Sequence, residues 1–188
     1  MNPLASLWKG YLRWRHSHGF GVHSPYAYHL VTTVVRPGDY GYYGYHPIER
    51  IFRSQRTDNP VFTESDIKLI LRLVLNMKAS RLVSPVASDK ALRMIKGAAR
   101  IPFLRLNPFF PEVYGPGDLL CLHGHKPGCS VTEELLSRGV AVIAFDPSPS
   151  IRETLEKPMS HGLLFSGKRI VITIPRREMA YVDYSMKF

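Results

Sequence analysis

Two short apolar runs separated by one amphipathic segment form the clearest pattern along the chain. Residues 118–122 and 140–145 have the length and apolar content of buried strands, and glycine or an Asp-Pro pair ends each run. Between them, Ser130 with a glutamate three residues later has the spacing of a helix-capping box. The pattern predicts a strand–helix–strand unit in a parallel sheet, which brings residues 123–125 and 146–148 to the same sheet edge.

Apolar residues at helical spacing predict two helices in the first 35 residues. The first covers residues 4–15, and Ser24 followed by Pro25 begins a second helix that runs to about residue 35. We expect both helices to pack on the rest of the protein, because their apolar faces need a surface to cover them. The residues of these faces are Leu4, Leu7, Trp8, Tyr11 and Leu12 in the first helix and Ala27, Leu30, Val31 and Val34 in the second.

The middle of the chain predicts a second strand-and-helix unit. Pro47 begins a short helix, and Thr63 with Asp66 three residues later caps a longer helix that ends near Met77. A short strand at 81–83, a helix over 89–99 and a strand near 103–106 follow. The loop between the first strand and the helix, residues 84–88, is where doubly wound folds usually hold a nucleotide.

The last forty residues change in character, from alternating strands and helices to strands alone. Ser150 is predicted to cap a helix that stops before Pro158. Strands follow at 163–165 and 169–174, and residues 181–188 alternate cleanly between apolar and polar side chains, which favours an antiparallel edge pair. The fold class predicted for the whole chain is α/β: a mostly parallel sheet with a C-terminal antiparallel hairpin and an N-terminal helical extension.

Composition limits the class of protein. The chain of 188 residues is 45% hydrophobic and 11% aromatic, which suffices for a packed core. It has no apolar run of about 18 residues, and three basic residues interrupt its first fifteen, so neither a membrane span nor a signal peptide is expected. Two cysteines, Cys121 and Cys129, are too few for a disulfide framework, and we expect a cytoplasmic protein.

The formal net charge of +10 is unevenly distributed. Lys and Arg minus Asp and Glu give +4 for residues 1–60, +5 for 61–100, −2 for 101–150 and +3 for 151–188. Lys68 and Arg72 are four residues apart on one helix, opposite its apolar stripe, and are expected to face solvent. The basic flanks therefore suggest contact with an anionic partner such as nucleic acid, or simply a soluble surface.

Histidine and cysteine side chains gather at two places. Cys121, His123, His125 and Cys129 lie within nine residues, and such ligands suit zinc; their spacing favours a buried structural cysteine with loop histidines instead, so we predict no metal. His16, His18 and His23 flank a glycine turn, and we expect them to cap and pack that turn.

Several segments resemble a known family. The segment HGFGVHSPYAYHLVTTVV near the N-terminus, the helix IKLILRLVLNM, the strand and turn DLLCLHGHKPG, and the strand AVIAFD with the helix and hairpin that follow it are similar to class I S-adenosylmethionine-dependent methyltransferases of the Bacteroidetes type. The resemblance implies a Rossmann-like sheet of seven strands ending in an antiparallel hairpin. Together with the element pattern, it leads us to expect an N-terminal helical extension, residues 1–60, that packs on a Rossmann-like methyltransferase-type domain, residues 61–188.

The resemblance also implies a place for the cofactor. The family's glycine-rich cofactor loop corresponds to Ser84–Ser88, followed by Asp89; no residue of that loop is glycine in this chain. His123 stands where the family carries an acidic residue, with His125 in the same turn, and Asp146 is the remaining member of an acidic pair.

These positions define two hypotheses of different classes. The first is a divergent methyltransferase-like protein that holds S-adenosylmethionine at Ser84, Ser88, Asp89, His123, His125 and Asp146, with catalytic residues and methyl acceptor unassigned. The alternative is a non-catalytic binding or scaffold protein, whose partner is an unknown small molecule or an anionic macromolecule that contacts the basic flanks.

Overall fold

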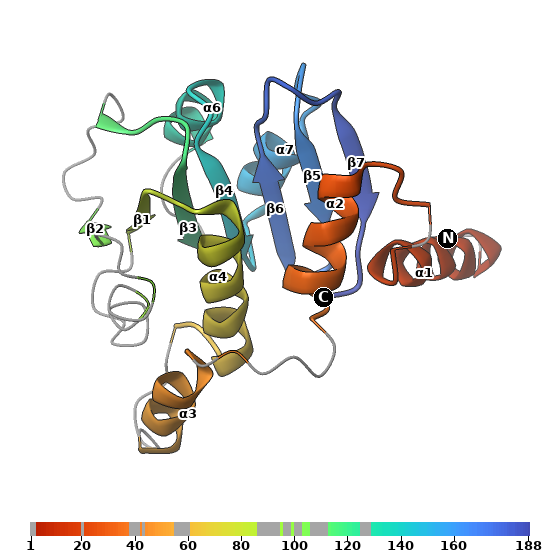
Figure 1. Cartoon of the computed structure of the whole chain (residues 1–188). Helices are drawn as coiled ribbons and strands as arrows, with labels where there is room; N and C mark the ends of the chain where they lie inside the picture. The colour runs from red at the N-terminus through yellow and green to blue at the C-terminus, as the bar shows by residue number, and fades with distance from the viewer. Residues whose placement is uncertain are drawn as a thin grey trace.

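The described residues form a mixed sheet of seven strands in the order β2-β1-β3-β4-β6-β5-β7 (Figure 1). The computed structural model describes residues 3–19, 21–37, 42, 44–54, 61–85, 95, 99, 103–105, 113–124 and 129–188. The strands are β1 (Arg81–Ser84), β2 (Phe103–Arg105), β3 (Asp118–His123), β4 (Ala141–Phe145), β5 (Leu163–Ser166), β6 (Ile170–Ile174) and β7 (Val182–Ser185).

One strand runs against all the others. β2, β1, β3 and β4 pair in parallel, β6 is antiparallel to both β4 and β5, and β7 pairs in parallel with β5. The prediction of a mostly parallel sheet with a C-terminal antiparallel hairpin, here β5 and β6, is confirmed. The prediction that the last strand pairs antiparallel is wrong: both edges of β6 are occupied, so β7 lies on the free edge of β5, and because the chain reverses once before β6 and again before β7, it runs parallel to β5.

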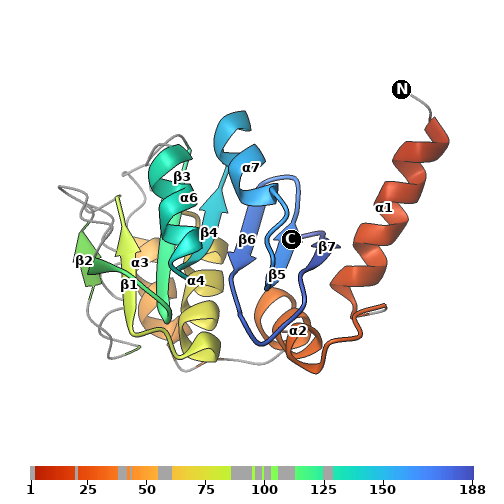
Figure 2. The same cartoon turned by 90° about the horizontal axis from the view of Figure 1, so that it is seen from above.

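Helices cover both faces of the sheet (Figure 2). On one face lie α2 (Pro25–His29), the π-helical turn η1 (Leu30–Val35) and α4 (Glu64–Met77), and on the other lie α6 (Cys129–Ser137) and α7 (Pro149–Glu156). α3 (Tyr45–Ser54) packs beside α4, while α1 (Pro3–Ser17) projects from the side of the sheet next to β7. The result is a three-layer α/β arrangement with one helix standing out from it.

The central strands β3, β4 and β6 are almost entirely apolar because both faces of the sheet are buried there. In β3, Leu119 and Cys121 contribute to the core under α4 and η1, whereas Leu120 and Leu122 contribute to the core under α6 and α7. On β4, Ile143 belongs to the core under α4 and η1, and Val142 belongs to the core under α6 and α7. This two-sided burial is what parallel sheets require, and it explains the apolar runs that identify the strands in the sequence.

The N-terminal segment is partly integrated into this core. All four residues predicted as the buried face of the second helix are buried, which confirms that prediction: Ala27, Leu30, Val31 and Val34. The expectation for the first helix is wrong, since Leu7, Trp8 and Tyr11 of α1 are exposed. The contacts of α1 with the body come instead from its other side, including the His16 ring against Tyr184 of β7.

Local capping signals agree with the structure at two positions and fail at two. Ser24 accepts a hydrogen bond from the Ala27 amide, and Thr63 and Asp66 form the predicted reciprocal capping box at the start of α4. Ser130 lies inside α6, which begins at Cys129, and Ser148 rather than Ser150 caps α7. The α7 start is explained by the next residue, a proline, whose fixed φ and missing N–H suit the first turn of a helix.

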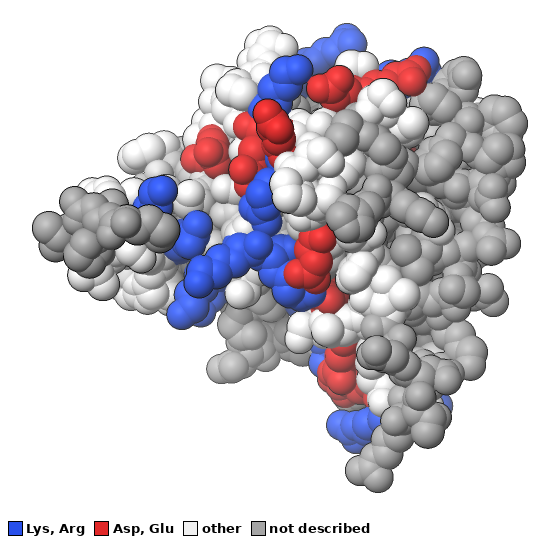
Figure 3. All heavy atoms as spheres, turned by 180° about the vertical axis from the view of Figure 1, so that it is seen from behind, with Lys and Arg blue, Asp and Glu red and all other residues white. Residues whose placement is uncertain are grey.

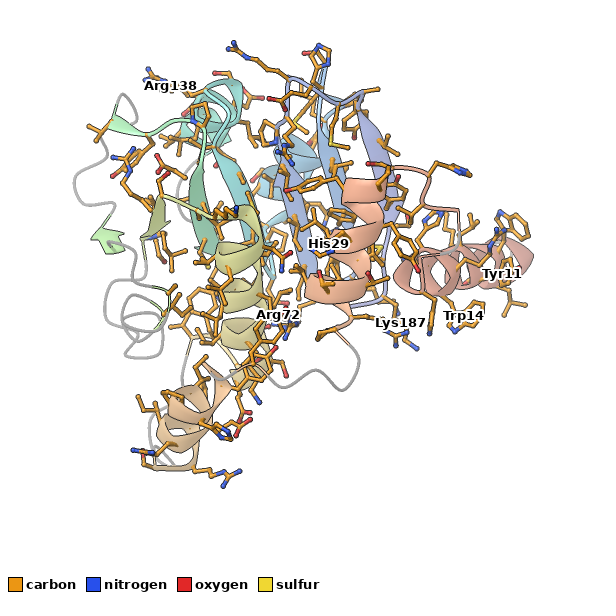
Figure 4. The ribbon with its side chains drawn as sticks, in the orientation of Figure 1. Tyr11, Trp14, His29, Arg72, Arg138 and Lys187 are labelled. Atoms are coloured by element: carbon orange, nitrogen blue, oxygen red, sulfur yellow. The ribbon has the colours of Figure 1, made fainter. Side chains whose placement is uncertain are left out.

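Arg72 and Lys68 do not form the solvent-facing basic pair that helical spacing predicts. Arg72 is buried: its Nε donates to the Val34 carbonyl at 2.5 Å and one terminal nitrogen donates to the Tyr45 hydroxyl at 2.7 Å (Figure 4). Lys68 forms ion pairs with Glu49 and Glu64, both at 2.7 Å. These two cations fasten η1 and α3 to α4, because those segments pack on the flank of α4 that the sequence presents as polar.

Replacing Arg72 with Met is expected to lower the free energy of unfolding by about 3 kcal/mol, because the buried Val34 carbonyl and the partly buried Tyr45 hydroxyl lose a charged donor. Lys68→Met should cost about 1 kcal/mol or less, since its ion pairs are partly exposed. Urea unfolding followed by circular dichroism measures both, and equal losses for the two variants would contradict the buried role of Arg72.

Candidate functional site

The carboxyl ends of β1, β3 and β4 meet at one edge of the sheet, near α3 and the start of α4 (Figure 1). The strand order reverses between β1 and β3, because β2 continues outward from β1 while β4 continues outward from β3. Open α/β sheets bind their ligands at such a switch point. Three predicted site residues, Ser84, His123 and Asp146, lie at the ends of these three strands.

Asp146 occupies an unusual backbone conformation directly after β4. Its φ is +46°, in the left-handed region that non-glycine residues rarely adopt. Its amide donates to the Arg169 carbonyl at 2.7 Å, which fixes the turn to the start of β6. The carboxylate side chain remains 49% exposed and approaches His123 Nε2 at 3.9 Å and an Arg169 terminal nitrogen at 3.3 Å. A turn held in this way presents the carboxylate at the switch-point edge.

Arg169 links Asp146 to a second carboxylate, on Asp66 of α4. Both terminal nitrogens of Arg169 donate to Asp66, whose side chain is only 1% exposed. The hydrogen bond with Asp66 raises the pKa of the Arg169 guanidinium above its ordinary value, and desolvation opposes that rise. One guanidinium therefore neutralises one buried and one exposed carboxylate at this edge.

Sequence reasoning missed this Arg169 network. Asp66 is recognisable in the sequence only as part of the capping box, and Arg169 only as the beginning of a strand. No local pattern connects two residues that are 103 positions apart. They meet because β6 runs backwards, which places its first residue beside the last residue of β4, at the edge of the sheet where α4 begins.

His123 and Ser84 have more structural surroundings. The His123 ring contacts the edge of the buried Phe62 ring, with 5.5 Å between ring centroids, and Phe62 contacts Phe145 in the same manner. Ser84 is fully buried at the end of β1. Of the two side chains, His123 is the one that a ligand at this edge can reach, because it is partly exposed.

The other predicted cofactor positions, Ser88, Asp89 and His125, lie outside the described residues, as does most of the predicted helix 89–99. Cys121 of the cysteine–histidine group is fully buried in the sheet, as predicted. Within the ranges that the structure describes, no three His, Cys, Asp or Glu side chains converge in a way that suits a metal ion.

A hollow of about 1220 Å³ opens at the opposite, amino edge of the sheet. Charged residues of both signs lie around it, and Arg138 marks its position at the top of the molecule in Figure 4. Arg176 lies over the Tyr26 ring at 4.1 Å from its centroid, and burial raises the pKa of the Tyr26 hydroxyl. The charged residues that line the hollow are Lys78, Arg138, Lys157, Arg176, Arg177, Glu133 and Glu178.

The cations around this hollow have a structural explanation. Lys78, Arg138 and Lys157 directly follow the last residues of α4, α6 and α7. The C-terminus of a helix carries a partial negative charge, and a cation placed there stabilises the helix. The partial negative charges of the three helix ends offset the positive charges of these side chains. The hollow therefore attracts an anion less than the number of its cations suggests.

Comparison of the sequence with family models and with curated proteins finds no match. Among the described residues, no helix is both long enough and apolar enough to cross a membrane.

Replacing Arg169 with Met is expected to destabilise the protein by about 3 kcal/mol, because the buried Asp66 carboxylate loses its counter-charge. Asp146→Asn should cost about 1 kcal/mol or less, since that carboxylate is half exposed. Thermal and urea unfolding measure the difference. A loss for Asp146→Asn as large as that for Arg169→Met would show that the exposed pair, and not the buried one, holds the network together.

Proposed function

We propose that this chain is a divergent class I S-adenosylmethionine-dependent methyltransferase-like protein whose carboxyl-edge site holds the cofactor weakly. The α/β sheet with a single inverted strand near the C-terminus is compatible with the Rossmann-like architecture that the sequence resemblance implies. The observation that carries the proposal is the Asp146 carboxylate, which follows β4, the next strand after β3 at the switch-point edge, and remains half exposed although it pairs with Arg169.

The local chemistry supports a ligand that bears hydroxyl or amino groups. Asp146 offers an exposed acceptor, and His123, 3.9 Å away, is able to donate or accept a hydrogen bond. Gly124 directly follows His123 in the turn after β3, and the space that a side chain at this position would occupy is open. The Ser148 amide donates to the Gly124 carbonyl at 3.3 Å, so the turns after β3 and β4 are held together. The edge is thus an organised surface with one accessible carboxylate.

Two features make weak binding the expected behaviour. The 84–88 loop lacks the glycine that allows backbone amides to approach a ligand closely. The Asp146 carboxylate is already paired with Arg169, so a ligand must compete with an internal cation for it. The missing loop glycine and the competition with Arg169 both lower the binding energy of the cofactor, so less free energy is left for accelerating a reaction.

Calorimetric titration with S-adenosylhomocysteine tests the proposal directly. We expect a dissociation constant weaker than about 100 μM, which corresponds to less than about 5.5 kcal/mol of binding free energy. Asp146→Asn should weaken binding about tenfold further, because the amide replaces a charged acceptor. Lys78→Gln, at the opposite edge of the sheet, is the control and should leave the affinity unchanged.

Each of the other outcomes argues against part of the proposal. Binding tighter than about 100 μM would indicate an efficient cofactor site and an active enzyme. No heat at millimolar ligand would favour a non-catalytic scaffold. Binding that responds to Lys78→Gln but not to Asp146→Asn would move the ligand to the amino-edge hollow.

A further inference from the structure

Helix α1 turns its aromatic side away from the protein. Leu7, Tyr11 and Trp14 follow one another at intervals of four and three residues, which places them on one face of the helix. They are 71%, 47% and 46% exposed, and Trp8 beside them is 60% exposed. Figure 4 shows Tyr11 and Trp14 directed away from the sheet. An ordinary surface helix does the opposite and buries its apolar stripe against the core.

The aromatic rings form a continuous surface along α1. Ring centroids are 5.7 Å apart between Trp8 and Tyr11, 6.3 Å between Tyr11 and Trp14, and 4.7 Å between Trp14 and His18. Tyr11 and Trp14 therefore have a neighbouring ring on each side. These contacts make one aromatic ridge that extends from Trp8 to His18.

Positive charge accompanies this ridge, and negative charge is lacking. Of the three cations on α1, Arg15 lies beside the ridge, whereas Lys9 and Arg13 lie on the other side of the helix; no Asp or Glu occurs anywhere in residues 1–38. Arg15 lies over the Tyr11 ring at 5.8 Å from its centroid. Arg36 hydrogen-bonds the His18 ring at the end of the ridge, at 2.6 Å from Nε2. Figure 3 shows Lys and Arg spheres on the projecting helix and the surface beside it.

We propose that α1 is an interfacial helix that docks this protein on the surface of an anionic lipid bilayer. Tyr and Trp side chains favour the headgroup region, where the ring is in an apolar layer and its polar atom is in water. Arg15 beside the ridge and Arg36 at its end are attracted to anionic headgroups. An apolar ridge with cations around it on a helix that projects from its domain is the combination that such docking needs.

Two other occupants fit these observations less well. A second copy of the chain would bring two strongly basic helices together without acidic partners, and like charges repel. Single-stranded RNA stacks its bases on flat ring platforms, whereas Trp8 and Tyr11 are tilted by 39° to each other and Trp14 and His18 by 41°, so the rings do not form one flat platform. A lipid surface requires only the outer edge of the ridge.

Docking through α1 leaves the carboxyl-edge site uncovered. α1 contacts β7, at one edge of the sheet, while the candidate site is built on β1, β3 and β4. β5 and β6 lie between β7 and β4. Membrane docking is therefore independent of the proposed cofactor binding.

The two tryptophans of the chain, Trp8 and Trp14, are both on α1, so intrinsic tryptophan fluorescence reports on this helix alone. We expect vesicles of phosphatidylcholine with phosphatidylglycerol to shift the emission to shorter wavelength and to sediment the protein, with both effects decreasing as salt is added. Vesicles of phosphatidylcholine alone should do so far less.

The matched variants are Leu7→Glu and Leu75→Glu, which make the same change on two exposed helix positions; Leu75, on α4, is 42% exposed. Leu7→Glu should reduce partitioning into the anionic vesicles by about tenfold or more, whereas Leu75→Glu should retain it. Circular dichroism checks that both variants are folded.

The proposal is overturned if the wild type neither shifts nor sediments, or if Leu7→Glu binds the vesicles as well as the wild type. A fluorescence shift that depends on protein concentration, with a dimer mass in the absence of vesicles, would instead assign the ridge to a second copy. Quenching by single-stranded RNA without any vesicle binding would assign it to nucleic acid.

Discussion

The buried ion pair between Asp66 and Arg169 is the interaction on which the arrangement of this protein depends. The Asp66 carboxylate accepts a hydrogen bond from the Thr63 amide, which completes the cap of α4. It also accepts hydrogen bonds from both terminal nitrogens of Arg169. A carboxylate that is almost completely removed from water requires such a partner. The pair thereby fixes the first turn of a face-covering helix against the beginning of the inverted strand, and the same guanidinium steadies the exposed carboxylate of Asp146.

The inverted strand β6 explains much of the rest. Since it is antiparallel to both of its neighbours, its first residues reach the edge where the parallel strands end. That edge gains a cation that a fully parallel sheet would not supply. The strand also occupies the edges of β4 and β5 that face each other, and β7 must therefore pair on the far side of β5, next to α1. Topology in this way determines both the charge of the candidate site and the position of the projecting helix.

Positive charge has three separate roles in this chain, and the net value of +10 does not distinguish them. Arg72, Lys68 and Arg169 are bonded to internal acceptors and hold segments together. Lys78, Arg138 and Lys157 sit at the ends of helices, where they offset the helix dipole. Arg15 and Arg36 accompany the exposed aromatic ridge of α1, and for that reason the partner surface is proposed there and not at the hollow on the amino edge.

The sequence by itself determined the features that depend on neighbouring residues. The apolar runs identified β3, β4 and β6, the helical spacing identified the buried side of α2 and η1, and Ser24 and Thr63 identified helix starts, because strand burial, helix periodicity and capping act within a few positions. It also placed Asp146 at the edge of the sheet. Only the tertiary structure decided that Arg169 reaches Asp66 and Asp146, that Arg72 is buried, and that α1 faces outward. Each of these depends on which distant segments become neighbours, and that depends on strand direction and on the competition of many apolar surfaces for the same core, neither of which a local pattern contains.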